Sequence, residues 1–247
     1  MTQSRGRARF AILVPFTNTN LEPDMMLLRP KGVSLHFSRL GGYDANEIPD
    51  ENQMHALGTA DLDQPLQLIM GINPDVIIYG CTSATLTHGP AFDRDFAAQI
   101  KAKSGAATIT AAGALVHALQ TLNVQRIGFA SPYVPAINDM AIDFLTEAGV
   151  ETVQRSEIDE PLDNLGQGAL DPDRVFELAR AADHPQAEAI VLSCTDMRSV
   201  EVIARLEATL GKPVISSNQA MMFQAMQLAG IGEALSGYGQ LLQGNWP

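Results

Sequence analysis

Three segments of the first half of the chain return, in the same order, in its second half. RFAILVPF at 9–16 is echoed by RIGFASPY at 126–133, and the CT pair at 81–82 returns at 194–195. The third pair is SGAATITAAGALVHALQTL at 104–122 and LGKPVISSNQAMMFQAMQL at 210–228. Repetition at this scale indicates one supersecondary unit that is built twice. We therefore expect two similar lobes that face each other across a cleft.

Strand-like and helix-like segments alternate along the chain. Apolar or β-branched runs bounded by turn residues predict strands at 9–16, 33–40, 75–82 and 106–110. Helical periodicity marks residues 50–71 and 85–104 between them. Several of the strands are apolar throughout, which is typical of parallel sheets covered on both faces. The pattern predicts the α/β class, with a ligand site outside the carboxyl ends of the strands.

The chain has two cysteines, Cys81 and Cys194, and each is followed by threonine at the end of an apolar run. A free cysteine is commonly a small buried hydrophobe, but two at equivalent positions of a repeat favour a function. The repeat would bring them to opposite walls of one cleft. A thiolate at the start of a helix is stabilised by unpaired N–H groups, and such a thiol can attack carbon or transfer a proton.

The net charge of −12 argues against nucleic acid as a partner, because phosphates bind to basic surfaces. The five histidines lack ligand spacing, so no metal site is expected. The apolar runs have the length of strands and no signal-peptide core follows the basic first residues, so we expect a cytoplasmic protein without a membrane partner. A small carboxylate substrate would need a local trap, which the hydroxyls and amides of CTSAT and CTDMRS can form without lysine.

Five short motifs, taken in order, resemble the landmarks of the aspartate/glutamate/hydantoin racemase superfamily: VPFTNTN, GCTSAT, ASPY, LDNL and LSCTDM. Within it the chain resembles the branch that contains maleate cis-trans isomerase and arylmalonate decarboxylase, above all in GKPVISSNQAMMFQAMQLAG. The resemblance implies two pseudo-symmetric, Rossmann-like α/β lobes with four-stranded parallel sheets and the active site in the cleft between them. We expect residues 8–110 and 218–247 to form the first lobe and 111–217 the second.

The resemblance also implies roles for single residues. Cys81 and Cys194 match the catalytic pair, and these enzymes use neither metal nor organic cofactor. Thr195 joins the expected substrate-binding residues because it lies in a hydroxyl-rich turn, where Thr82, Ser83 and Thr195 can equally be helix N-caps. The residues expected to bind the substrate or lie over it are Asn18, Thr82, Ser83, Tyr133, Asn164 and Thr195.

The activity implied by the resemblance is that of an isomerase of a small (di)carboxylic acid, most like maleate cis-trans isomerase, which converts maleate to fumarate. Cys81 would add to the double bond, and Cys194 would supply and remove the proton. The pair equally suits an aspartate, glutamate or hydantoin racemase. Arylmalonate decarboxylase has glycine at the position of Cys81, which speaks against a simple decarboxylase. An ectoine-degradation family member and a two-lobed binding protein without activity are further alternatives.

Two charged residues after Cys194 leave the substrate open. Asp196 could receive an ammonium group. Arg198 is expected on a solvated helix surface, but turned inward it would bind a distal carboxylate with two hydrogen bonds. Residues 38–50 are rich in turn formers and could close over a substrate. The sequence leaves the oligomeric state open, a homo-oligomer included.

Overall fold

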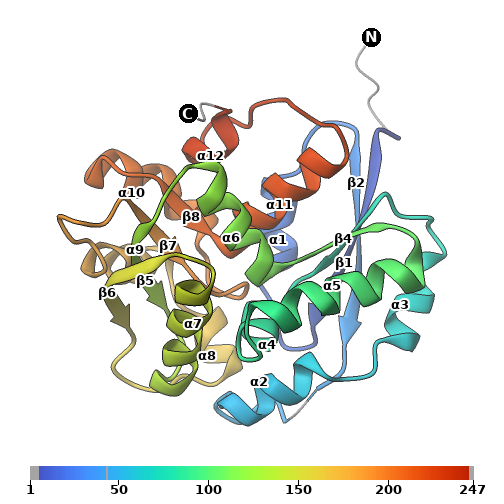
Figure 1. The fold of residues 1–247 in the computed structure, drawn as a ribbon, viewed down its shortest axis with the longest axis horizontal. Coiled ribbons are helices and arrows are strands. Elements are labelled where there is room, and N and C mark those ends of the chain that lie inside the picture. Colours follow the sequence, from blue (N-terminus) through green and yellow to red (C-terminus); the bar gives the residue numbers. More distant parts are fainter. Residues whose placement is uncertain (1–5, 43, 245–247) are drawn as a thin grey trace.

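The computed structural model describes residues 6–42 and 44–244, and in it the chain forms two four-stranded parallel sheets (Figure 1). The first sheet has the order β2-β1-β3-β4, with β1 Ala8–Pro15, β2 Val33–Leu40, β3 Val76–Tyr79 and β4 Ala107–Thr110. The second has the order β6-β5-β7-β8, with β5 Arg126–Ser131, β6 Glu151–Glu157, β7 Ala189–Leu192 and β8 Val214–Ser216. The second order repeats the first strand by strand, which confirms the predicted α/β fold of two similar lobes.

Helices cover both sheets. Those that follow strands of the first sheet are α1 Leu21–Leu27, α2 Glu51–Gly58, α3 Asp63–Met70, α4 Thr82–Leu86, α5 Pro90–Ser104 and α6 Ala111–Thr121. Those that follow strands of the second are α7 Pro135–Glu147, α8 Asn164–Gly168, α9 Pro172–Ala181, α10 Ile203–Leu210, α11 Ser217–Leu228 and α12 Gln240–Gln243, with a 3₁₀ turn at Val200–Val202.

Helices α6 and α11 join the two lobes. Each begins directly after the last strand of a sheet, and each is capped by the hydroxyl of the residue before it, Thr110 or Ser216. Helix α6 contacts β4 and β8, while α11 contacts β3, β4, β8 and α6. Because both helices touch both sheets, the lobe boundaries expected at 110/111 and 217/218 stay a prediction. The last residues of the expected first lobe, 245–247, lie outside the described residues.

The predicted elements differ from the observed ones where glycine or a short loop interrupts them. The helical segment 50–71 is two helices, α2 and α3, and the segment 85–104 is broken at Gly89, whose φ of 85° lies in the left-handed region. Strand β3 ends at Tyr79, and the next residue, Gly80, packs closely against the first sheet. A Cβ at this glycine would lie 2.4 Å from Leu21 Cδ2 and 2.9 Å from the Leu13 carbonyl oxygen. The loop expected at 38–50 begins after Leu40, and its residue 43 lies outside the described residues.

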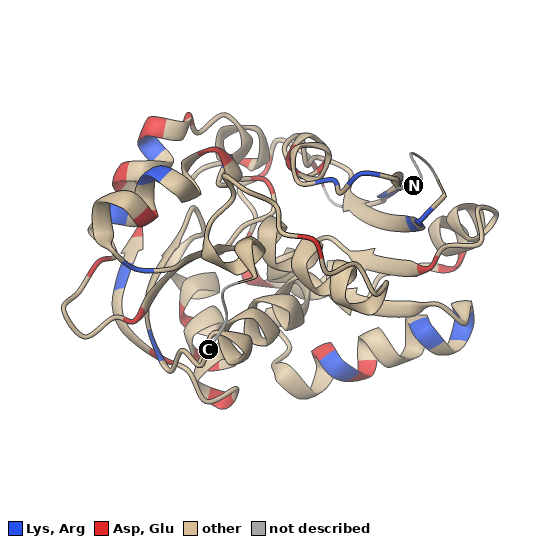
Figure 2. Cartoon of the chain, turned by 90° about the horizontal axis from the view of Figure 1, so that it is seen from above, with Lys and Arg blue, Asp and Glu red and all other residues tan. Residues whose placement is uncertain are grey.

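Charged side chains lie on the outer elements of the fold. Figure 2 shows Lys and Arg positions beside Asp and Glu positions on the peripheral helices and loops. Several form exposed ion pairs, such as Arg180 with Glu177 and Lys103 with Asp63. Among the residues that the structure describes, no helix has the length and apolarity needed to cross a bilayer.

Asp24 carries a buried carboxyl that contacts residues of both lobes. Asp24 of α1 accepts a hydrogen bond from Asn218 Nδ2 at 2.7 Å, and the same nitrogen donates to the Thr195 carbonyl oxygen at 3.1 Å. Burial raises the pKa of Asp24 to about 7, and the nearby Glu201 adds to the rise, while the hydrogen bond from Asn218 opposes it. The folded protein therefore prefers this carboxyl in its neutral form.

We expect Asp24→Asn to raise the free energy of unfolding at pH 8 by about 2 kcal/mol. Because the folded pKa of Asp24 exceeds the unfolded one, the wild-type protein loses stability as the pH rises from about 4 through 7, where the unfolded chain binds fewer protons. The asparagine variant lacks this loss. Urea denaturation at pH 5.5 and 8 measures the free energy of unfolding of both proteins, and Asp143→Asn, at an exposed position, is the control. The same pH dependence in Asp24→Asn and the wild type would contradict the assignment.

Candidate active site

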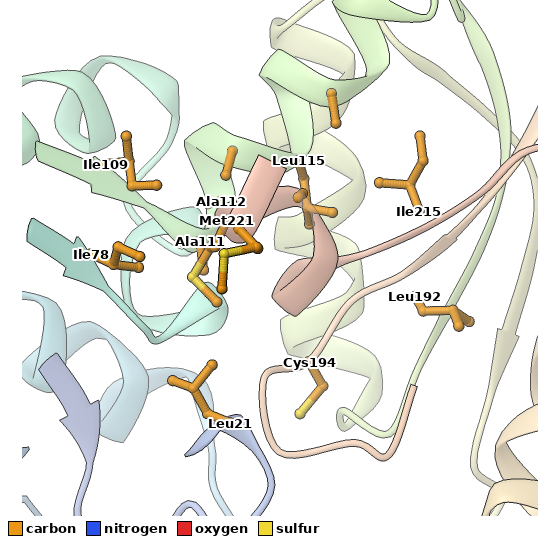
Figure 3. Close-up of a cluster of buried hydrophobic side chains, with 14 of the residues drawn as sticks. Leu21, Ile78, Ile109, Ala111, Ala112, Leu115, Leu192, Cys194, Ile215 and Met221 are labelled. Atoms are coloured by element: carbon orange, nitrogen blue, oxygen red, sulfur yellow. The ribbon is translucent and has the colours of Figure 1, made fainter. Parts of the chain in front are cut away.

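A cavity of about 40 Å³ lies between the two sheets, and both cysteines line it. Cys81 follows β3 and Cys194 follows β7, which are equivalent strands of the two sheets. Their side chains are almost fully buried, with 6% and 4% of the residue exposed. Figure 3 shows Cys194 on its turn beside a buried apolar cluster that includes Leu21 and Met221. The repeat has thus brought the two thiols to one cavity from different lobes.

The six residues expected to bind substrate line the same cavity. They come from five separate places: the loop after β1, the first residues of α4, the turn after β5, the start of α8 and the turn after β7. All six are buried: Asn18, Thr82, Ser83, Tyr133, Asn164 and Thr195. Their roles toward a substrate stay predictions, but the structure places every one of them within a single site.

A second cavity, of about 520 Å³, is larger but holds none of these residues. It lies among α5, α6 and α7 and is lined by side chains such as Arg94, His117 and Phe144. We therefore identify the candidate site by the chemistry of its wall and not by its size.

Cys81 is surrounded by hydrogen-bond donors. It is the residue before α4, and its Sγ lies 3.7 Å from the Ser83 hydroxyl. Burial raises the pKa of Cys81, whereas the N–H groups of Ala84 and Ser83 and the Ser83 hydroxyl lower it. These donors favour the thiolate over the thiol.

Cys194 has a different environment. Its Sγ faces the Oε1 atom of Gln167 at 3.8 Å and accepts the backbone N–H of Asp196 at 3.4 Å. Burial, followed by the negative charge of Asp196, raises the pKa of Cys194 to about 12. This thiol therefore holds its proton at neutral pH.

Backbone N–H groups stabilise both thiolates, as expected, from Ser83 and Ala84 at Cys81 and from Asp196 and Met197 at Cys194. Burial outweighs the backbone donors at each cysteine, since the pKa of both thiols is raised. The two are nevertheless unequal, because the donors around Cys81 oppose the effect of burial and the carboxylate beside Cys194 adds to it. The surroundings of Cys81 therefore disfavour ionisation by burial alone, whereas those of Cys194 add a negative charge to burial.

A threonine ties the two cysteine turns together. The Thr195 hydroxyl donates to the Gly80 carbonyl oxygen at 3.0 Å and accepts from Asn18 Nδ2 at 2.9 Å. Gly80 directly precedes Cys81, and Thr195 directly follows Cys194. The Asn18 Oδ1 atom is occupied by the N–H groups of Asn20 and Leu21. These bonds connect the turn that carries Cys194 to the end of the strand that leads to Cys81.

The wall of the cavity is rich in hydroxyls and poor in charge. The Thr82 hydroxyl donates to Ser217 at 3.0 Å, and the buried phenol of Tyr133 lies near the side chains of Ser193 and Thr82. Burial raises the pKa of Tyr133 well above its usual range, so the phenol keeps its proton. No Lys, Arg or His is found among the described residues that line the cavity. Dipoles alone would hold an anion here.

Asp196 connects the lobes. Its Oδ1 atom accepts the backbone N–H groups of Thr19 and Asn20 at 2.7 and 2.9 Å, and the side chains of the same two residues at 3.2 and 3.1 Å. Burial raises the pKa of Asp196, and these hydrogen bonds oppose the rise. Four donors occupy Oδ1, so this atom joins the two lobes, and the expectation that Asp196 receives an ammonium group stays a prediction.

Arg198 lies away from the cavity. Its guanidinium forms two hydrogen bonds with the Glu201 carboxylate, at 2.8 and 2.9 Å, on the exposed surface. The expectation of a solvated residue is confirmed, and no carboxylate clamp is formed. Metal ligands do not gather either: within residues 6–42 and 44–244 no group of three His, Cys, Asp or Glu side chains could hold an ion.

Thr17, Met54 and Gln167 are among the lining residues that were not predicted from the sequence. The Ser83 hydroxyl contacts Met54 Sδ at 2.9 Å, and the Thr17 hydroxyl donates to Asn164 Oδ1 at 3.3 Å. A signal for Gln167 was present, because it stands three residues after Asn164 and residues with this spacing share a helix face.

Comparisons with known proteins agree with this fold. A family model described as arylmalonate decarboxylase matches residues 66–242. Maleate isomerase from Geobacillus stearothermophilus is 27% identical over 257 residues, which cover 96% of this chain and 98% of the relative. Arylmalonate decarboxylase from Bordetella bronchiseptica is 28% identical over 243 residues, which cover 93% and 91%.

Two solved structures of maleate cis-trans isomerase from Nocardia farcinica superpose with a TM-score of 0.85 and cover 96% of this chain and 98% of theirs. One is bound to TRIS and is 25% identical. The other, 24% identical, is a cysteine-to-serine mutant with a covalently bound succinylcysteine intermediate. Both have the two-lobed architecture described above.

Proposed function

The chain belongs to the arylmalonate decarboxylase family of enzymes, and we propose that within this family it is a two-cysteine isomerase of a small dicarboxylic acid, converting maleate to fumarate. The observation that carries the proposal is the pair of buried thiols, Cys81 and Cys194, at equivalent strand ends on one cavity. Their unequal surroundings support different tasks, a nucleophile and an acid.

The reaction starts with Cys81 as thiolate and Cys194 as thiol. The Cys81 sulfur forms a bond to one olefinic carbon, and Cys194 transfers its proton to the other carbon. This addition gives a thioether intermediate, in which the former double bond is a single bond and can rotate. Cys194, now a thiolate, then takes a proton back from the same carbon, the C–S bond breaks, and the trans acid leaves. Both thiols return to their starting forms, so atoms and charges balance.

The hydroxyl wall would bind the substrate carboxylates and the negative charge that develops on one of them during addition. Thr82, Ser83 and Tyr133 supply neutral donors, and Asn18 keeps one N–H of its amide beyond the bond to Thr195. The hydroxyls of Thr82 and Ser83, which donate to Ser217 and to Met54 Sδ, would rotate toward the substrate as it binds. Asn164, tied to Thr17 on the opposite lobe, would lie over the substrate.

The relatives support this choice within the family. The Geobacillus stearothermophilus protein is named maleate isomerase, and the Nocardia farcinica enzyme has been captured with a succinylcysteine intermediate. The Bordetella bronchiseptica relative, at similar identity, is named arylmalonate decarboxylase. A decarboxylase that protonates one face of its intermediate needs one acid thiol, so the second buried thiol favours the isomerase. Two-thiol racemisation of an amino acid is the second candidate, because it also uses a thiol on each wall.

One experiment separates the candidates. The protein is incubated in deuterated buffer with maleate, with each enantiomer of aspartate and glutamate, and with phenylmalonate. Fumarate formation supports the proposal, deuterium at the α-carbon of an amino acid supports racemisation, and loss of carbon dioxide supports decarboxylation. If none of these is seen and the variants Cys81→Ala and Cys194→Ala keep a ligand-induced thermal shift, the protein binds its ligand without acting on it.

A further inference from the structure

Gln167 lies against a sulfur that takes part in the proposed reaction. It is in α8, 8% exposed, and lines the cavity. Its Oε1 atom is 3.8 Å from Cys194 Sγ, within hydrogen-bond distance for sulfur. None of the expected roles for the site includes this residue.

The orientation of the Gln167 amide is fixed by a hydrogen bond of its nitrogen atom. Its Nε2 atom donates to the Leu162 carbonyl oxygen at 3.4 Å. If the amide were turned over, its oxygen would face that carbonyl oxygen, and two acceptors would repel each other. The atom that faces Cys194 is therefore the amide oxygen, which can only accept a hydrogen bond.

An acceptor beside a thiol has a definite chemical effect. The Cys194 S–H can donate to Gln167 Oε1, whereas a thiolate there would meet the negative end of the amide dipole. The negative charge of the Asp196 carboxylate, two residues after Cys194, likewise disfavours the thiolate. Backbone N–H donors lie near both sulfurs, from Ser83 and Ala84 at Cys81 and from Asp196 and Met197 at Cys194, so the acceptors beside Cys194 make the difference. The two sulfurs are thus distinguished by the polarity of their neighbours.

We propose that Gln167 is a positioning residue that holds the proton on Cys194, so that Cys194 is the acid of the reaction and does not compete with Cys81 as nucleophile. The proposal rests on the proposed function for its meaning in catalysis. The hydrogen bond itself can be tested without turnover. Gln167 acts through Cys194 and needs no contact with the substrate.

The test uses the fact that the chain has two cysteines, so that Cys81→Ser leaves Cys194 as its single thiol. In this background the pKa of Cys194 is measured from the ultraviolet absorbance of the thiolate, after subtraction of the Cys81→Ser, Cys194→Ser protein. We expect Gln167→Met, which is similar in size but lacks the acceptor, to lower that pKa by about one unit, which is about tenfold more thiolate at a given pH. Gln167→Glu keeps an acceptor and should not lower it.

Leu165→Ala is the matched control, since Leu165 lies on the same short helix and is exposed. A Cys194 pKa that does not fall in Gln167→Met, or that falls equally in Leu165→Ala, overturns the proposal. With Cys81 restored, Gln167→Met should lower kcat for fumarate formation about tenfold with little change in KM. If the pKa falls as expected but the wild-type protein forms no fumarate, the proposed function fails while the role of Gln167 stands.

Discussion

Replacing Cys81 with alanine is expected to lower the rate of fumarate formation from maleate by at least about 10³-fold, because the covalent step loses its nucleophile. The Ser83 hydroxyl, 3.7 Å from Cys81 Sγ, does not substitute for it, since a hydroxyl is a far weaker nucleophile at neutral pH than a thiol. Fumarate absorbance under saturating maleate gives the rate. A thermal melt of the variant, compared with the wild type, shows that the fold is retained.

Mass spectrometry of the two cysteine variants during turnover distinguishes the roles of the two thiols. Under turnover, Cys194→Ser should accumulate on Cys81 a covalent adduct heavier by one maleic acid molecule, because proton removal and release are slowed. Cys81→Ala should carry no adduct on Cys194, whose pKa of about 12 leaves little thiolate at neutral pH. Peptide mass spectrometry locates the adduct. An adduct on Cys194, or fumarate formation in Cys81→Ala near the wild-type rate, would contradict the assignment.

The sequence was sufficient to predict the two lobes and the meeting of Cys81 with Cys194. The repeat carries this information, because equivalent strand ends of two copies face the same cleft. The sequence did not reveal which way the polar side chains after Cys194 point. Asp196 and Arg198 are two residues apart, and one is buried between lobes while the other is on the surface. That difference depends on contacts with Thr19 and Asn20, far away in the sequence, which no local pattern reports.

An acidic protein that binds an anion needs a site shielded from its own charge. Here many of the charged positions lie on peripheral helices and loops (Figure 2), and the polar part of the cavity wall consists of hydroxyls, amides, two thiols and the carboxyl of Asp196. The one carboxylate in the wall, Asp196, has an oxygen covered by four donors. The cost of bringing an anion near it is thereby reduced, and the charge that remains acts on Cys194, where it favours the thiol.

Asp196→Ala is expected to lower the free energy of unfolding by about 3 kcal/mol, because hydrogen bonds to a carboxylate are among the strong ones and four donors lose their acceptor together. Two of the donors are the backbone N–H groups of Thr19 and Asn20, of which Asn20 would keep only its longer bond to Asn18 Oδ1. The variant should also lose turnover, since the turns that hold Asn18 and Thr195 are no longer fixed to each other. Urea denaturation gives the stability.

The substitution Asp196→Asn separates the effect of the hydrogen bonds that Asp196 accepts from the effect of its negative charge. It keeps an oxygen at the Oδ1 position, so most of the stability should remain, while the pKa of Cys194 should fall because the negative charge that raises it is gone. Arg198→Ala is the neighbouring control, and its exposed pair with Glu201 should contribute less than about 0.5 kcal/mol. If Asp196→Ala and Arg198→Ala changed the stability equally, Asp196 would not be a bond between the lobes. A Cys194 pKa that stayed unchanged in Asp196→Asn would show that burial alone keeps this thiol protonated.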